Sequence, residues 1–174
     1  MSGELKEELR RLGADVRPGS EMPNDVREMI EAYAPGLPRA GQVGVELKRL
    51  ARDQVYTYED PYLKLLIPVP PLDIFEAVVR ELERLGPDLT DIHEYVTVIG
   101  RAFWLLHRKP ERRGFLRKRY ALREPTDDEA LKFLEEKVKR ADVVIKSLAP
   151  ALFGLIEFVM YKKKEGADPQ DTAA

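Results

Sequence analysis

Residues 89–106, which read LTDIHEYVTVIGRAFWLL, carry the clearest structural signal in the chain. Their large apolar side chains recur at alternating intervals of three and four residues, the spacing that places side chains on one face of an α-helix. The same spacing occurs in the preceding segment, residues 75–85, and in a following one, residues 131–148. Stripes of this kind on consecutive long helices predict nearly antiparallel packing. We therefore expect an all-α fold, a helical bundle of about six to eight helices.

Helix-ending residues divide the rest of the chain into further helices. Gly86 and Pro87 end the helix at 75–85, and Pro150 ends or kinks the helix that starts at Thr126. Residues 126–129, TDDE, predict a capping box, in which the threonine hydroxyl accepts from the third amide and the glutamate returns to the first. Shorter helices are predicted at residues 2–12, 24–34 and from residue 42, and a last apolar helix at residues 151–164.

One stretch, residues 54–69, favours strand. Its two halves, residues 55–58 and 62–69, are rich in β-branched, aromatic and aliphatic residues, and residues 59–62 (EDPY) suit a turn. The prolines in its second half disfavour a long ladder. We expect one small β-hairpin here; the alternative is a helix end followed by an extended linker.

The length and composition are those of one globular domain. The chain has 174 residues, of which 44% are hydrophobic and 34% charged, enough to bury a core. We expect a single helical domain at residues 1–164, in which residues 1–70 pack on a long-helix bundle at residues 71–164. Residues 165–174 are expected to form a disordered tail.

The composition also excludes several classes of function. Because the chain has no cysteine, a structural disulfide, a thiolate metal site and a cysteine nucleophile are ruled out. Many charges beside few Asn and Gln residues indicate a protein from a hot environment. The charged first residues do not resemble a signal peptide, and the longest apolar stretch, residues 148–161, is too short to cross a bilayer. We expect a cytoplasmic protein with no membrane partner.

The most unusual feature is a basic block at residues 101–123. It holds nine Lys and Arg residues and one acid, so its formal charge is +8, whereas the rest of the chain carries −10. Aromatic residues are interleaved with the cations, an arrangement that suits phosphate contacts and base stacking. Pro110 and Gly114 place part of the block in a connection between helices. The residues expected to contact an anionic partner are Arg108, Lys109, Arg112, Arg113, Arg117, Lys118, Arg119 and Arg123.

The sequence leaves several uses of the basic block open. Its partner is a nucleic acid or an acidic protein surface, or the cations only pair with acidic helices of the same chain, such as residues 129–139, or with a second subunit. Proteins that coat nucleic acid without specificity are usually basic overall, which this chain is not. The asymmetry therefore favours a localised docking site on a subunit of a nucleoprotein complex.

The last predicted helix is apolar around nearly its whole circumference. Such a helix is buried on several sides or presents one face to another subunit. Gly154 in its middle permits close approach. We expect a homo-oligomer or a subunit of a larger complex, with a protein interface formed by Phe153, Ile156 and Met160.

Two groups of residues carry the atoms that catalysis or metal binding requires. Arg101 and His107 form an Arg-x5-His pair, which resembles the short Arg–His element of the HEPN ribonucleases, all-α proteins that cleave RNA. That family usually has a polar residue after the arginine, and here the residue is Ala102. The second group offers oxygen and imidazole ligands at a helix start, where exposed amides favour acids without any metal. Its members are Asp88, Asp91, His93 and Glu94.

These observations together predict a non-enzymatic adaptor subunit of a nucleic-acid-processing or nucleoprotein complex, with no metal and no cofactor. Its basic block would dock an anionic partner. One alternative, implied by the resemblance, is a HEPN-like ribonuclease with Arg101 and His107 as its catalytic pair. The other alternative is a homo-oligomeric structural protein with no nucleic-acid role.

Overall fold

The structure, a computed structural model, describes residues 22, 24–40, 54–86, 89, 91–107, 111–112, 118–119, 123–138 and 140–160. These residues are mostly helical and include a small antiparallel sheet. The helices predicted at residues 2–12 and from residue 42, and the predicted tail at 165–174, lie outside them. The predicted total of six to eight helices includes two of those segments and stays a prediction, as does the division at residue 70.

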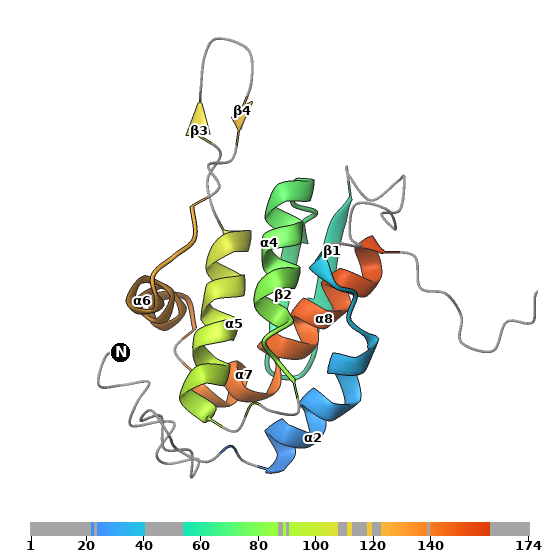
Figure 1. Cartoon of the computed structure of the whole chain (residues 1–174), viewed down its shortest axis with the longest axis vertical. Coiled ribbons are helices and arrows are strands. Elements are labelled where there is room, and N and C mark those ends of the chain that lie inside the picture. Colours follow the sequence, from blue (N-terminus) through green and yellow to red (C-terminus); the bar gives the residue numbers. More distant parts are fainter. Residues whose placement is uncertain are drawn as a thin grey trace, which may run out of the picture.

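Two antiparallel helices, α4 (Leu72–Leu82) and α5 (Ile92–Leu106), form the centre of the fold (Figure 1). The predicted stripe of α5 is buried, and so are side chains on other faces of the same helix, such as Tyr95 and Ala102. Burial on several faces follows from the position of α5, because α4 packs on one side of it and α6 (Asp127–Lys137) on another. The nearly antiparallel packing predicted from the stripes is therefore present in this pair.

The continuous helix predicted from Thr126 towards Pro150 is interrupted. The helix α6 ends at Lys137, Val138 and Arg140 are extended, and two further helices follow, α7 (Ala141–Lys146) and α8 (Leu148–Val159). Val138, within the break, is buried, so the apolar spacing continues across it. The spacing alone therefore does not reveal that the helix is interrupted. Figure 1 shows α6 end-on where α4 and α5 run lengthwise, so α6 crosses them instead of joining an antiparallel bundle.

The position of Pro150 also differs from the prediction. It lies in the first turn of α8, where the absence of its N–H removes no helical hydrogen bond. The last helix thus starts before Pro150 instead of after it, and it ends at Val159.

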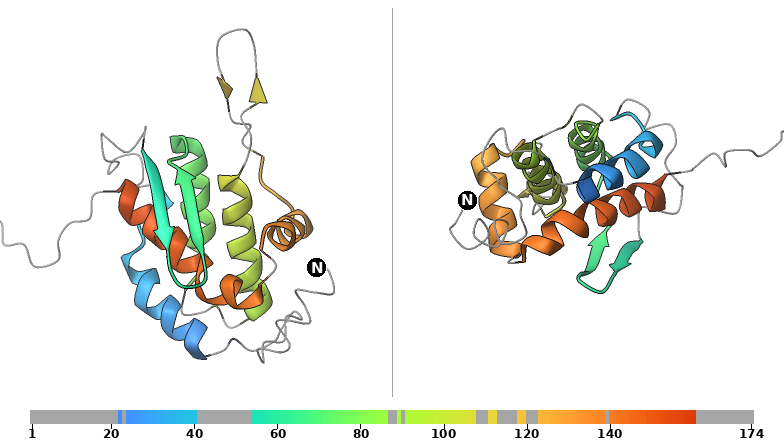
Figure 2. Two further views of the ribbon diagram at one scale, coloured as in Figure 1. Left: turned by 180° about the vertical axis from the view of Figure 1, so that it is seen from behind. Right: turned by 90° about the horizontal axis from the view of Figure 1, so that it is seen from below.

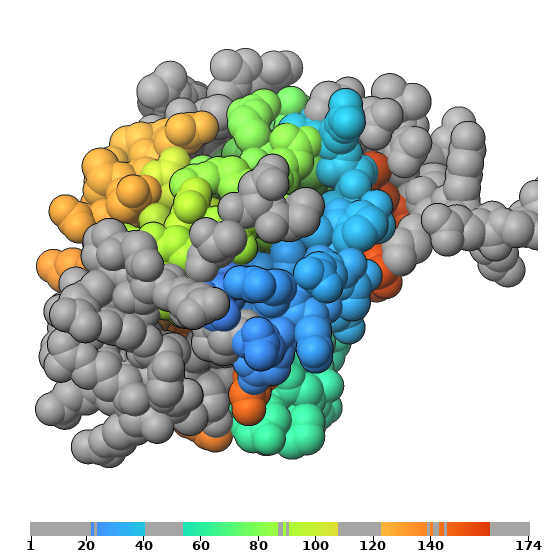
Figure 3. Space-filling model, turned by 60° about the horizontal axis from the view of Figure 1, so that its bottom comes forward, coloured from blue at the N-terminus to red at the C-terminus, as the bar shows by residue number. Residues whose placement is uncertain are grey.

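The helix α8 lies in the middle of the molecule. Figure 2 shows it with α2 (Asn24–Tyr33), α4 and α5 on one side and the sheet on the other. Tyr33, the last residue of α2 before a short 3-10 turn, η1 (Ala34–Gly36), stacks on Phe153 of α8 with ring centroids 5.3 Å apart. In the space-filling view, α2 lies at the surface on this side of the molecule, and residues of the sheet are visible below it (Figure 3).

The predicted hairpin at residues 54–69 is confirmed. Its strands, β1 (Val55–Glu59) and β2 (Lys64–Pro68), pair in the register Val55↔Pro68 to Glu59↔Lys64. Asp60 closes the turn, because its carboxylate accepts from the backbone N–H groups of Tyr62 and Leu63, each at 2.7 Å. Burial alternates along both strands, and Tyr56 and Ile67 face the core.

Gly154 allows this sheet to lie close to α8. A Cβ atom at Gly154 would overlap the Tyr56 hydroxyl, and the Tyr56 ring also packs against Phe158 with centroids 5.5 Å apart. The close approach predicted for Gly154 is therefore confirmed, and the neighbour is the β1 strand of the same chain.

A second, smaller hairpin lies within the basic block. Its strands, β3 (Glu111–Arg112) and β4 (Lys118–Arg119), pair Glu111 with Arg119 and Arg112 with Lys118. Figures 1 and 2 show both strands beyond the C-terminal end of α5, away from the helices. The sequence predicted only a connection between helices here.

Candidate functional site

The basic block divides into two structural parts. Residues 108–122, which we call the basic arm, hold seven Lys and Arg residues and Glu111, a formal charge of +6. They contain β3 and β4 and connect α5 to the segment that enters α6. The other two cations, Arg101 and Arg123, lie at the base of the basic arm, and the structure describes their side chains.

Arg101 is the centre of an ion cluster that joins three elements. Its side chain is 12% exposed, and Nε donates to Glu81 of α4 at 2.9 Å. Its Nη1 donates to the carbonyl of Pro125 and to Asp127 at the start of α6, and Nη2 lies 3.7 Å from Glu124. Arg101 therefore ties α5 to α4 and to the segment that enters α6.

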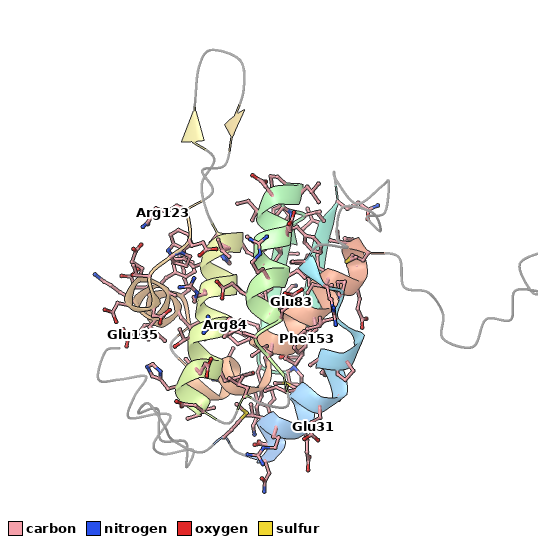
Figure 4. All side chains as sticks on the ribbon, viewed as in Figure 1. Glu31, Glu83, Arg84, Arg123, Glu135 and Phe153 are labelled. Atoms are coloured by element: carbon pink, nitrogen blue, oxygen red, sulfur yellow. The ribbon has the colours of Figure 1, made fainter. Side chains whose placement is uncertain are left out.

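The surroundings of Arg101 keep it charged. Burial would lower the pKa of this guanidinium, but the hydrogen bond and charge of Glu81, helped by Asp127, outweigh burial and raise the pKa. Arg84 extends the cluster, since it lies 3.3 Å from Glu81 and 3.4 Å from Glu94 of α5. Figure 4 shows Arg84 at the contact between α4 and α5.

Arg123 is also paired within the chain. Its two Nη atoms donate to the two carboxylate oxygens of Glu129, at 3.0 and 2.7 Å, and its guanidinium carbon lies 5.2 Å from the centroid of the Trp104 ring. The hydrogen bond from Arg123 lowers the pKa of Glu129, and the same bond raises the pKa of Arg123. Figure 4 shows Arg123 above α6, on the side of that helix toward β3 and β4. An anionic partner at Arg123 would therefore have to displace Glu129.

The capping box predicted at the start of α6 is present. The Thr126 hydroxyl accepts from the Glu129 N–H at 3.2 Å, as the sequence predicts. The Glu129 carboxylate returns to the backbone N–H of Thr126, and it also accepts from Arg123 and from the Thr126 hydroxyl.

Within the basic arm, the structure fixes a register. Arg112 and Lys118 are direct cross-strand partners, and so are Glu111 and Arg119. The other predicted contact residues of the arm, Arg108, Lys109, Arg113 and Arg117, lie outside the described residues. The acids nearest the base, Glu124, Asp127 and Glu129, pair with Arg101 or Arg123.

The structure gives little support to Arg101 and His107 as a catalytic pair. They are six positions apart along the chain, which corresponds to a rotation of about 240° around the helix axis. Arg101 is committed to the ion cluster described above. The His107 Nδ1 lies 2.8 Å from the carbonyl of Phe103, and its ring packs against Phe103 and Phe133. Both residues thus have structural roles that explain their positions.

The acids at the start of α5 have structural partners as well. Asp91 caps the helix by accepting from the His93 N–H at 2.9 Å, and Glu94 pairs with Arg84. Asp88 lies outside the described residues. Among the residues that the structure describes, no three His, Asp or Glu side chains gather in the way that a metal site requires. Over the same residues, every helix is too short or too polar to span a membrane.

The three residues predicted as a protein interface, Phe153, Ile156 and Met160, are buried inside the chain itself. They are covered because α8 lies between the helices and the sheet (Figure 2). The sequence did not indicate the exposed apolar side chains on the outer face of the β1–β2 sheet, where Val55 is 52% and Leu66 is 65% exposed. Residues 65–67 (LLI) are all apolar, so their pattern does not show which side chain points outward.

No model of a protein family, no curated protein and no solved structure matches this chain. A function for it therefore has to be argued from its own residues.

Proposed function

We propose that this chain is a non-enzymatic adaptor that docks onto a nucleic acid through the basic arm, as a subunit of a nucleoprotein complex. The observation that carries the proposal is the antiparallel pairing of Arg112 with Lys118 in a hairpin that lies away from the helices. A hairpin in that position can meet a partner without any rearrangement of the core.

The distribution of charge supports a docking role. The basic arm carries +6, and the remainder of the chain carries −8. A polyanion is attracted to the arm and repelled by the remainder, so binding is confined to one end of the molecule. The acids closest to the arm do not cancel its charge, because Glu124, Asp127 and Glu129 pair with the cations at its base.

The pairing of β3 with β4 favours a nucleic acid over an acidic protein surface. A two-stranded β-ribbon fits the major groove of B-form DNA, where cations on its strands reach phosphates on either side. Arg101 holds the start of α6 to α4 and α5, so the point from which the hairpin emerges is fixed. A fixed base lowers the cost of ordering the arm on binding.

The proposal is tested by titrating labelled single- and double-stranded DNA and RNA at two salt concentrations. We expect binding that weakens as salt rises, because bound phosphates release counterions. Replacing Arg112→Ala together with Arg113→Ala should weaken binding and reduce the slope of log K against log salt by about 0.9 for each phosphate that the variant no longer neutralises.

The control variant removes the same charge from exposed helix positions, Lys132→Ala with Lys146→Ala. It should bind as the unaltered chain does. No binding at low salt, or equal weakening in the two double variants, would show that the basic arm is not a nucleic-acid site. Turnover of the RNA that disappears in His107→Ala would instead favour the ribonuclease alternative.

A further inference from the structure

The β1–β2 sheet has two open edges, one along each strand. The hydrogen bonds between the strands identify the residues whose backbone groups form these edges. Val69 N donates to Gln54 O at 3.1 Å, and Asp60 N donates to Leu63 O at 2.9 Å. In an antiparallel pair, hydrogen-bonded positions alternate with positions whose backbone groups point away from the partner strand. Val55, Thr57 and Glu59 of β1 therefore direct their N–H and C=O groups outward.

The two edges differ in their protection. On β2 the outward positions are Lys64, Leu66 and Pro68, and Pro68 has no N–H to donate. Lysine and proline are residues that natural sheets place on edges to prevent further pairing. The β1 edge has neither residue, and within the described part of the chain β1 pairs only with β2.

The same positions carry exposed side chains. Val55 is more than half exposed, Thr57 is exposed, and Leu66, the cross-strand partner of Thr57, is the most exposed large apolar side chain in the described residues. A sheet with one solvated face normally alternates apolar inward and polar outward. The outer face of this sheet departs from that rule at Val55, which lies on the open β1 edge, and at Leu66, which lies on the other strand.

We propose that the β1 edge pairs with the β1 edge of a second copy of this chain, antiparallel and about a twofold axis at Thr57. Thr57 then lies opposite Thr57 of the second copy, and Val55 lies opposite Glu59 of the second copy. The two hairpins join into one four-stranded sheet that rests on two α8 helices. This dimer does not depend on the proposed nucleic-acid function.

The occupant is a second copy because the β1 edge can pair with itself without setting like charges opposite each other. Only the register centred on Thr57 pairs all three outward residues of one β1 with all three of the other. It places the acidic Glu59 opposite Val55, whereas a register centred on Glu59 would set two carboxylates directly opposite each other, which is unfavourable. A threonine opposite a threonine is a favourable cross-strand pair.

The test is the mass of the chain in solution, measured by light scattering and by sedimentation over a range of concentrations. The unaltered chain should have twice the mass of one chain and dissociate on dilution. Thr57→Lys should have the mass of one chain, because it sets two lysines opposite each other at the axis. Its matched control is Leu66→Lys, which adds the same charge to the other member of the same cross-strand pair and should remain dimeric.

A rescue experiment separates a broken interface from a misfolded variant. Thr57→Glu alone should also be a monomer, and an equal mixture of Thr57→Lys and Thr57→Glu should recover the dimer, because opposite charges then meet at the axis. An unaltered chain that stays a monomer at all concentrations would overturn the proposal. So would a dimer that Thr57→Lys leaves intact, or a mixture that fails to associate.

Discussion

The two hairpins of this molecule relate to its helices in opposite ways. The β1–β2 hairpin has five residues in each strand and lies against α8, with Tyr56 and Ile67 buried. The β3–β4 hairpin pairs two residues in each strand and lies away from the helices (Figure 1). Both are antiparallel, so backbone pairing alone does not decide whether a hairpin packs against the core.

The two hairpins differ in what each strand can bury. A large apolar side chain gains about 1.5–3 kcal/mol on full burial, and β1 and β2 each supply one such side chain at an inward position. The strands of the second hairpin contain only Glu, Arg and Lys, whose burial without partners is strongly unfavourable. The β1–β2 sheet is therefore part of the core, whereas β3 and β4 carry no apolar side chain that could join it.

The largest expected effect comes from removing an inward side chain of the first hairpin. Ile67→Ala should lower the free energy of unfolding by about 2–5 kcal/mol, because Ile67 is only 4% exposed and its truncation leaves a cavity above α8. The control is the adjacent outward residue, where Leu66→Ala should change stability by less than about 0.5 kcal/mol. Urea unfolding measures both, and equal effects would contradict the assignment of inward and outward faces.

A second prediction distinguishes the base of the basic arm from the arm itself. Arg101→Met should destabilise the chain by about 2–3 kcal/mol, because among the described residues it leaves the buried Glu81 with Arg84 alone as an ionic partner. Arg112→Met, in the arm, should stay within about 0.5 kcal/mol of the unaltered chain.

Thermal and urea unfolding of the two methionine variants provide the measurement. Adding Glu81→Met to Arg101→Met should recover part of the stability, since the orphaned carboxylate is then removed as well. If Arg101→Met lowers the free energy of unfolding no more than Arg112→Met does, the ion cluster around Arg101 does not stabilise the fold as described.

The smallest of these effects concerns the packing of the first hairpin on α8. Gly154→Ala should cost about 1–3 kcal/mol, because its Cβ overlaps the Tyr56 hydroxyl and the strand has to shift. In a Tyr56→Phe background the cost should be smaller, since the overlapping oxygen is absent. A double-mutant cycle measured by urea unfolding gives the coupling, and a coupling of zero would contradict direct packing of Tyr56 on Gly154.

Local signals in the sequence predicted the elements whose causes are local. The stripe of α5, the threonine cap of α6 and the hairpin at residues 54–69 depend on residues close together in the chain, and all three are present. The break after Lys137 escaped prediction, because the buried Val138 keeps the apolar spacing through it. Spacing reports which side chains are buried, and it does not report whether the helix between them is continuous.

The candidate site was less predictable because its partners are distant in sequence. The sequence identified the basic block, but Glu81, which pairs with Arg101, comes from another helix. The apolar character of α8 indicated burial on several sides, but not that the chain itself supplies the cover, including Tyr33 and Tyr56. The prediction of an interface at Phe153, Ile156 and Met160 therefore named side chains that the chain already covers.

The packing of Tyr56 on α8 has a consequence for biosynthesis. The β1–β2 hairpin needs only its own residues to pair, but the helix that covers it is made much later, after α4, α5, α6 and α7. At ribosomal rates of about 5–20 residues per second, β1 and β2 are synthesised several seconds before the helix that covers them. An isolated two-stranded hairpin is only marginally stable in water, so the first-made sheet of this chain is expected to become stable only when α8, among the last elements made, packs against it.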